Sequence, residues 1–96
     1  MFIIHITYQV DLEKIEAHLE AHISYLNTYY EAGVFLTSGR KVPRNGGIIL
    51  AKAKSLQELE DIVAKDPFNL HNLAAYEIVE FVPTKAAKNL ELLIEQ

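Results

Sequence analysis

The candidates for acid–base chemistry in this sequence are its four histidines and the aspartate of one Asp-Pro-Phe corner. His22 is the first candidate, because it lies at the border of an apolar stripe, three residues after Leu19 and four before Leu26. An imidazole at such a border can face a crevice and take up or release a proton near neutral pH. The alternative is a half-buried boundary histidine with no chemical role.

Asp66 is the candidate partner of His22, and it stands before Pro67 where a predicted helix ends. A carboxylate at a helix C-terminus faces the negative end of the helix dipole, so we expect Asp66 to have a partner elsewhere. A carboxylate bound to one ring nitrogen fixes the tautomer of a histidine and stabilises its imidazolium form. The alternative is a turn residue whose carboxylate accepts hydrogen bonds from nearby backbone N–H groups. The two residues are far apart in the sequence, and their spacing leaves open whether they meet.

Ser38, Gly39 and Arg40 stand at the end of a predicted strand and form a candidate binding site. Gly39 permits close approach of a ligand, Ser38 can donate a hydrogen bond, and Arg40 can hold a carboxylate or phosphate bidentately. Arg40, Lys41 and Arg44 place three of the nine basic residues within five positions of an acidic chain, which favours a small anionic ligand. The alternatives are a solvated strand end and a charged edge that prevents aggregation.

The other histidines give weaker signals. His18 and His22 have the i, i+4 spacing of helical metal ligands, but residues 18–22 read HLEAH rather than HExxH. A solvated helix face explains this pair, and we predict no metal site. His5, on a predicted strand, and His71, after the Asp-Pro-Phe corner, are further candidate pocket residues. The sequence contains no GxGxxG, P-loop or GxSxG motif, so we also predict no organic cofactor.

The composition restricts the classes of function further. The 96 residues, half of them hydrophobic and 23% charged, suit one globular domain over residues 1–96. The absence of cysteine excludes disulfides, thiolate metal sites and cysteine nucleophiles, and the net charge of −4 argues against nucleic-acid binding. The N-terminus lacks the basic region of a signal peptide, and no apolar run approaches the roughly 20 residues that span a bilayer. We therefore expect a cytoplasmic protein with no membrane partner.

Alternating strand and helix patterns place these candidates on a fold. Strand patterns cover residues 2–9, 34–41, 48–53 and 73–82. Apolar residues at spacings of three and four predict a helix over residues 12–30, which Gly33 ends. Ser55 and Glu58 form a capping box that starts a second helix, and residues 85–94 predict a short C-terminal helix. The order β-α-β-β-α-β predicts an α+β, ferredoxin-like fold, with one antiparallel sheet and two helices on one face.

Helices on one face leave the other face of this sheet uncovered. The strands over residues 2–9 and 73–82 have few side chains polar enough to keep that face in water. An exposed apolar sheet face of this size marks an interface. We therefore predict a homodimer that packs sheet on sheet, with the C-terminal helix as a candidate for docking on the partner.

Several short patterns follow one another along the chain in a recognisable order. They are an H-x-x-Y-L segment from His22, a G-x-x-x-x-S-G stretch from Gly33 to Gly39, a GGIILA strand and the D-P-F corner at Asp66. Together they resemble the YciI-like, or YCII-related, family over about residues 1–83. The sequence departs from many members at Leu19, where they have arginine, and at Arg40, where they have proline.

The resemblance implies a ferredoxin-like fold that dimerises into an α/β barrel, similar to muconolactone isomerase, with a His–Asp pair at His22 and Asp66. We thus expect a small cofactor-independent enzyme that does isomerase-, lyase- or hydrolase-type acid–base chemistry on a small anionic molecule. His22 would move the proton and Asp66 would orient it. The residues expected to bind the substrate are Ser38, Gly39, Arg40, Pro67, Phe68 and His5. The alternative is a non-catalytic ligand-binding or interaction module of the same fold.

Overall fold

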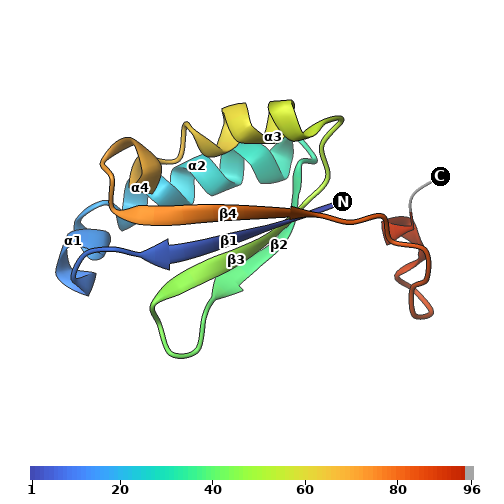
Figure 1. Ribbon diagram of the computed structural model, residues 1–96, viewed down its shortest axis with the longest axis horizontal. Helices are drawn as coiled ribbons and strands as arrows, with labels where there is room; N and C mark the ends of the chain where they lie inside the picture. The colour runs from blue at the N-terminus through green and yellow to red at the C-terminus, as the bar shows by residue number, and fades with distance from the viewer. Residues whose placement is uncertain (95–96) are drawn as a thin grey trace.

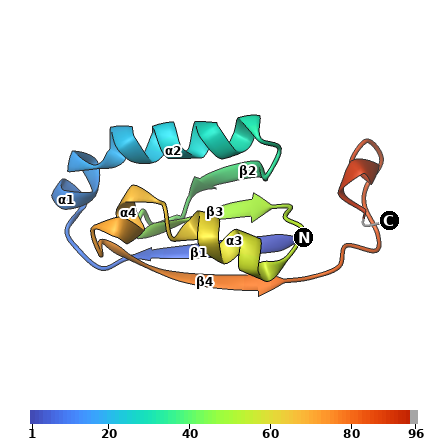
Figure 2. The same cartoon turned by 90° about the horizontal axis from the view of Figure 1, so that it is seen from above.

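A four-stranded antiparallel sheet forms one layer and helices form the other in the computed structural model, which describes residues 1–94 (Figure 1). In sheet order, the strands are β2 (Phe35–Arg40), β3 (Gly46–Ala51), β1 (Phe2–Tyr8) and β4 (Ala74–Glu80). In chain order, the helices are α1 (Leu12–Ala17), α2 (Leu19–Glu31), α3 (Leu56–Val63) and α4 (Pro67–Leu70). Seen from above, α2 runs along the β2 side of the sheet, and α3 and α4 lie toward β4 (Figure 2). The predicted ferredoxin-like α+β fold is confirmed.

The inner strand β1 builds the core, because side chains alternate between the two faces of a sheet. Phe2, Ile4 and Ile6 are buried toward the helices. Ile4 lies opposite Ile49 of β3 and Ile78 of β4, so the three strands contribute to one apolar layer. The other buried residues of this cluster are Ile15, Phe35, Ala51, Leu59, Ile62, Val63, Phe68, Leu73 and Ala74.

The predicted start of the second helix at Ser55 and the predicted end of the first helix at Gly33 are both found in the structure. The Ser55 hydroxyl accepts a hydrogen bond from the backbone N–H of Glu58 at 3.1 Å and caps α3. The Glu58 carboxylate accepts from the backbone N–H of Lys54, one residue earlier than in a standard capping box. Gly33 follows α2 with a φ of 77°, a left-handed conformation that glycine adopts without steric strain.

The predicted helix over residues 12–30 is two helices. The backbone leaves helical geometry at His18, where φ is −112° and ψ is 6°. Helix α1 lies at the end of the sheet, and α2 runs along its face (Figure 2). A continuous periodicity of apolar residues does not reveal such a change of axis, because both helices bury side chains at the same spacing.

The predicted C-terminal helix over residues 85–94 does not form, and this prediction is wrong. Among the described residues, this segment contains one short 3-10 helix, Glu91–Leu93. Residues 81–94 extend beyond the end of the sheet (Figure 1), and Leu90 and Leu92 are exposed. An isolated helix shorter than about 12 residues is marginal in water, and this segment has no surface to pack against.

The sheet face opposite the helices is uncovered, as predicted (Figure 1). The exposed apolar side chains that alternate onto this face are Ile48, Val79 and Phe81. Within residues 1–94, every helix is too short or too polar to cross a bilayer.

Candidate active site

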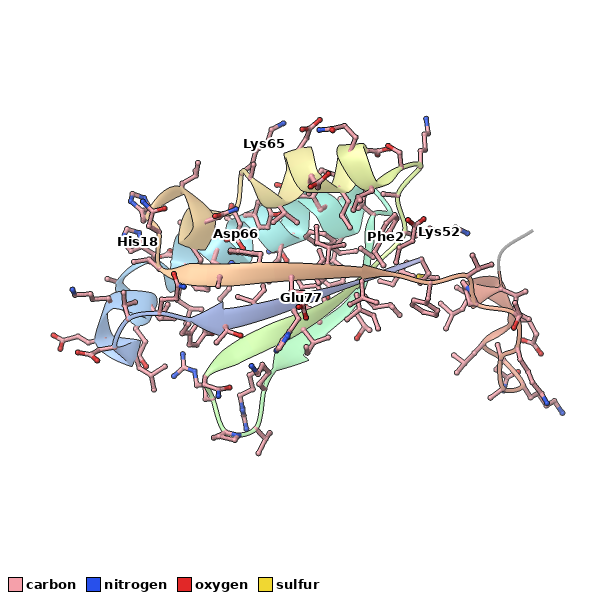
Figure 3. All side chains as sticks on the ribbon, viewed as in Figure 1. Phe2, His18, Lys52, Lys65, Asp66 and Glu77 are labelled. Carbon is pink, nitrogen blue, oxygen red and sulfur yellow. The ribbon has the colours of Figure 1, made fainter. Side chains whose placement is uncertain are left out.

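Asp66 is the only buried charged side chain among the described residues, with 1% of its surface exposed. Asp66 does not end α3, contrary to the expectation from the sequence, because α3 ends at Val63. Asp66 instead caps the N-terminus of α4, where its Oδ1 accepts a hydrogen bond from the backbone N–H of Phe68 at 3.0 Å. A carboxylate is favoured at this end of a helix, and Pro67 suits the first helical position. Figure 3 shows Asp66 between the sheet and the helices.

Three hydrogen-bond partners surround the Asp66 carboxylate. Besides the Phe68 backbone, Tyr76 of β4 donates its hydroxyl to Oδ2 at 2.6 Å, and Nδ1 of His22 lies 2.8 Å from Oδ1. The Phe68 N–H and the Tyr76 hydroxyl are donors, which suits a carboxylate, because its oxygens accept hydrogen bonds. Nδ1 of His22 is a third donor to this carboxylate in the tautomer that carries its proton on Nδ1.

His22 reaches this carboxylate from α2, and 12% of its side chain is exposed. Its ring stacks on Phe68, with the ring centroids 4.0 Å apart and the planes 7° from parallel. When Nδ1 donates to Asp66, the neutral imidazole keeps a lone pair on Nε2. No hydrogen bond to Nε2 is formed within residues 1–94, so this atom is available to a ligand.

Beside His22, a pocket of about 220 Å³ opens between α2 and the strands β2 and β3. Its polar lining comes from His22 and from the strand end and hairpin residues Ser38, Gly39, Arg40 and Arg44. Its apolar lining comes from Ile6, Leu19, Ile23, Leu26, Ile49, Phe68 and the ring of Tyr8. The pocket thus combines a proton acceptor, an apolar wall and a cationic end.

The two arginines of the pocket differ in their partners. Arg44 forms an ion pair with Glu16 of α1 at 3.0 Å. Arg40 has no ion pair or side-chain hydrogen bond within the described residues. Ser38 shares a 2.5 Å hydrogen bond with the Tyr30 hydroxyl, which fixes its side chain at the pocket edge. Among the residues that the structure describes, Arg40 is therefore the positive charge at this site that lacks an acidic partner.

The structure brings together most of the predicted site residues. His22, Ser38, Gly39, Arg40 and Phe68 all line the pocket, and Asp66 contacts His22 from behind. Two predicted substrate-binding residues do not line it. Pro67 begins α4 outside the pocket lining.

His5 lies on the open face of the sheet, with Nδ1 3.8 Å from the Glu77 carboxylate. Figure 3 shows Glu77 on the side of the sheet away from the helices. The position of His5 is a consequence of strand alternation, since Ile4 and Ile6 on either side of it point to the helices.

His18 and His71 also lie outside the pocket, where their rings stack on each other with centroids 4.2 Å apart. Within residues 1–94, no group of three or more His, Asp or Glu side chains is arranged to hold a metal ion.

Sequence reasoning missed two polar residues of the site. Arg44 belonged to the basic cluster that favours an anionic ligand but was not among the predicted binding residues, and it lines the pocket. Tyr76 was assigned to a strand without any chemical role, and it binds Asp66. The only available signal was a tyrosine on a face whose strand neighbours, such as Ala74 and Ile78, are apolar. A hydroxyl on such a face needs a polar partner.

Burial raises the pKa of two tyrosines near this carboxylate, Tyr25 and Tyr76, and the charge of Asp66 raises both further. Both hydroxyls therefore keep their protons throughout the physiological range. Tyr25 donates its proton to the backbone carbonyl of Ile62 at 2.9 Å rather than to Asp66. Tyr76 is thus the tyrosine whose hydroxyl hydrogen-bonds to the carboxylate.

We expect the free energy of unfolding to fall above about pH 10, where tyrosines in the unfolded chain ionise. The raised pKa values keep Tyr25 and Tyr76 neutral in the folded protein, so the unfolded state releases protons that the folded state retains. The stabilisation is complete below about pH 10 and is lost as the pH rises further. Urea denaturation at pH 8 and pH 11 measures this. The Tyr25→Phe/Tyr76→Phe double variant should lose less stability between these two pH values, and an equal loss would contradict the explanation.

Comparisons with known proteins give one matching family and a solved structure with a similar fold. A family model described as "YCII-related domain" matches residues 1–82. A search of curated proteins found no match. One similar solved structure is 5-chloro-2-hydroxyhydroquinone dehydrochlorinase from Burkholderia phenoliruptrix AC1100, in complex with 2,5-dihydroxybenzoquinone. It has 20% sequence identity and a TM-score of 0.74, and the alignment covers 83% of this chain and 91% of the dehydrochlorinase chain. At this identity, the likeness concerns the fold.

Proposed function

The chain belongs to the YCII-related domain family, and from that premise we propose that it is a small acid–base enzyme acting on an anionic small molecule. The observation that carries the proposal is the His22–Asp66 hydrogen bond of 2.8 Å, made by a histidine that also lines a pocket. The proposed reaction class is a proton-transfer reaction such as an isomerisation or an elimination.

In the proposed mechanism, Nε2 of His22 takes a proton from a carbon or hydroxyl of the bound molecule. Asp66 holds the ring through Nδ1 and stabilises the imidazolium that forms. For an isomerisation, His22 returns the proton to another atom of the substrate. For an elimination, a leaving group departs with the electron pair of the broken bond. One positioned proton transfer of this kind contributes roughly 10²–10⁴-fold to a rate.

The pocket lining supports an anionic, partly apolar substrate. Arg40 offers a guanidinium that can hold a carboxylate or enolate bidentately. Phe68 and the apolar side chains around it suit the flat or aliphatic body of the molecule. Gly39 lines the pocket between Ser38 and Arg40 with backbone atoms alone, because glycine has no side chain.

The similar dehydrochlorinase is an example of this fold carrying out an elimination. Loss of HCl requires removal of a proton and departure of chloride, which a single base can begin. That protein was crystallised with 2,5-dihydroxybenzoquinone, a small flat molecule with acidic hydroxyl groups. A molecule of this kind suits a pocket with an apolar wall and one uncompensated arginine.

We also propose that the protein is a homodimer formed through the open face of the sheet. Val79 and Ile48 are 48% and 39% exposed there, beside the partly buried Ile3 and Leu50. A second copy presents the same surface, so one twofold contact would cover both apolar faces. His5 and Glu77 lie on this face and would form part of the interface.

The alternative function is ligand binding without catalysis, which the pocket alone would support. The two functions differ in whether His22 moves a proton of the ligand. Candidate anions with an acidic C–H, incubated with the protein in D₂O, would exchange that hydrogen faster if the protein catalyses proton transfer. Binding without accelerated exchange, for every candidate that binds in the pocket, would favour the alternative.

Arg40→Gln is expected to weaken binding of a pocket anion about tenfold or more, because a charge-assisted hydrogen bond is lost. The probe is 2,5-dihydroxybenzoquinone, titrated by NMR or calorimetry. Lys41→Gln is the matched control: it removes the same charge from the next residue, which does not line the pocket. Equal weakening in both variants would indicate general electrostatic attraction and would contradict a specific role of Arg40.

A further inference from the structure

We propose that Tyr76 is a positioning residue that acts through Asp66 and sets the pH at which His22 takes up its proton. The role deepens the proposed function and rests on it, since it gives His22 a defined state as a base. Tyr76 has no contact with the pocket, because it does not line it. Its influence on chemistry there must pass through the carboxylate that it shares with His22.

The geometry connects three side chains from three elements. The Tyr76 hydroxyl, on β4, donates to Oδ2 of Asp66 at 2.6 Å, and Oδ1 of the same carboxylate binds Nδ1 of His22, on α2. The bond from Tyr76 is short, as hydrogen bonds to an ionised oxygen are. With Asp66 only 1% exposed, water does not replace a missing donor. Oδ2 therefore binds Tyr76, and Oδ1 binds both His22 and the Phe68 backbone N–H.

The direction of the effect follows from charge. A hydroxyl that donates to the carboxylate stabilises its negative charge and makes it a weaker acceptor for the proton shared with His22. Without that donor, Asp66 attracts the proton more strongly, and the imidazolium next to it becomes more stable. The His22–Asp66 pair then binds its proton up to a higher pH, whichever of the two carries it. Tyr76 thus keeps His22 unprotonated, and so able to act as a base, at lower pH.

The other groups that face this carboxylate do not supply the same effect. Tyr25, on α2, and Tyr8, on β1, act on Tyr76 through space, and neither donates a hydrogen bond to Asp66. The Phe68 N–H that donates to Oδ1 belongs to the backbone, so a side-chain substitution at position 76 does not remove this donor. Tyr76 is therefore the side chain that can be changed to alter the proton affinity while the His22–Asp66 contact stays.

The test compares Tyr76→Phe with Tyr25→Phe. Each variant keeps the ring and removes one half-buried hydroxyl with one hydrogen bond, so their structural effects are matched. Titration of the His22 ring by NMR needs no substrate. We expect the midpoint in Tyr76→Phe to move up by roughly half a pH unit or more, and the midpoint in Tyr25→Phe to stay at the wild-type value. No upward shift, or the same shift in both variants, would overturn the proposal.

A second variant keeps the test valid if Tyr76→Phe does not fold. Fluorotyrosine at position 76 preserves the shape of the side chain and makes its hydroxyl a stronger donor. The His22 midpoint should then move down rather than up. An unchanged midpoint in this variant would overturn the proposal in the same way.

Activity separates this proposal from the proposed function. On any molecule that the protein turns over, the acid limb of the pH dependence of kcat/KM should move up in Tyr76→Phe by the same amount as the His22 midpoint. KM above that limb should stay unchanged, since Tyr76 touches no ligand. A shifted His22 midpoint without proton transfer to or from any pocket ligand would refute the proposed enzymatic function and support the influence of Tyr76 on His22. Turnover of a substrate with an unshifted His22 midpoint would support the enzyme and refute the role of Tyr76.

Discussion

His22→Gln is expected to lower kcat/KM by about 10²–10⁴-fold for any substrate whose proton is transferred in the pocket. Glutamine keeps the polarity and much of the volume of histidine, but it does not accept a proton near neutral pH. The apolar wall and Arg40 remain, so binding of the anion should change much less than turnover. Stopped-flow or steady-state kinetics, with binding measured separately, distinguish the two effects.

Asp66→Asn is expected to cause a loss of similar size by a different route. Asparagine is a good N-cap, so the start of α4 is preserved, but a neutral amide does not stabilise the imidazolium. His71→Gln is the control, because His71 lies outside the pocket and stacks on His18. Full activity in either His22→Gln or Asp66→Asn would refute the proposed pair. A comparable loss in His71→Gln would refute the assignment of the effect to the pocket.

Val79→Lys is expected to weaken the proposed dimer by a factor of 100 or more. Val79 lies on the open sheet face opposite Ile3 and is 48% exposed in the single chain. Packing a second copy on this face would bury the lysine charge among apolar side chains, which is strongly unfavourable. Sedimentation velocity over a range of protein concentrations measures the change in dissociation constant.

Gln57→Lys serves as the control for added charge, since Gln57 is exposed on α3, on the other side of the sheet. Its dimer should have the wild-type dissociation constant. A wild-type protein that stays monomeric at all concentrations would contradict the proposed dimer. A dimer that Val79→Lys leaves unchanged would place the interface elsewhere.

The elements of the fold were predictable because each leaves a local pattern. The β-branched and aromatic residues over positions 2–9 predicted a strand, and the structure has β1 at Phe2–Tyr8. Ser55 and Gly33 marked helix ends by local backbone chemistry, and the structure places them there. The exceptions are the break at His18, the short helix α4, and the segment over residues 85–94, whose pattern is helical but which has no surface to pack against.

The role of Asp66 could not be predicted correctly from its neighbours. Next to Pro67, it was assigned to the end of one helix, although it begins the following one. The expectation that it has a partner was based on an unfavourable dipole, and in the structure the dipole is favourable. Its bond to the Phe68 backbone N–H is local, as the alternative interpretation of Asp66 expected, but His22 and Tyr76 come from distant segments, and no local pattern encodes their contact with this carboxylate.

By itself, the sequence determined the order of the four strands, the apolar stripes of the helices that pack on them, and a histidine at the border of one such stripe. These features depend on residues a few positions apart, whose relative placement is set by backbone geometry. Only the tertiary structure decided that His22, Asp66 and Tyr76 meet, and that His5 faces away from them. Their contact depends on how α2, α4 and β4 pack around one core, and such long-range packing has no signature in the spacing of the residues that it joins.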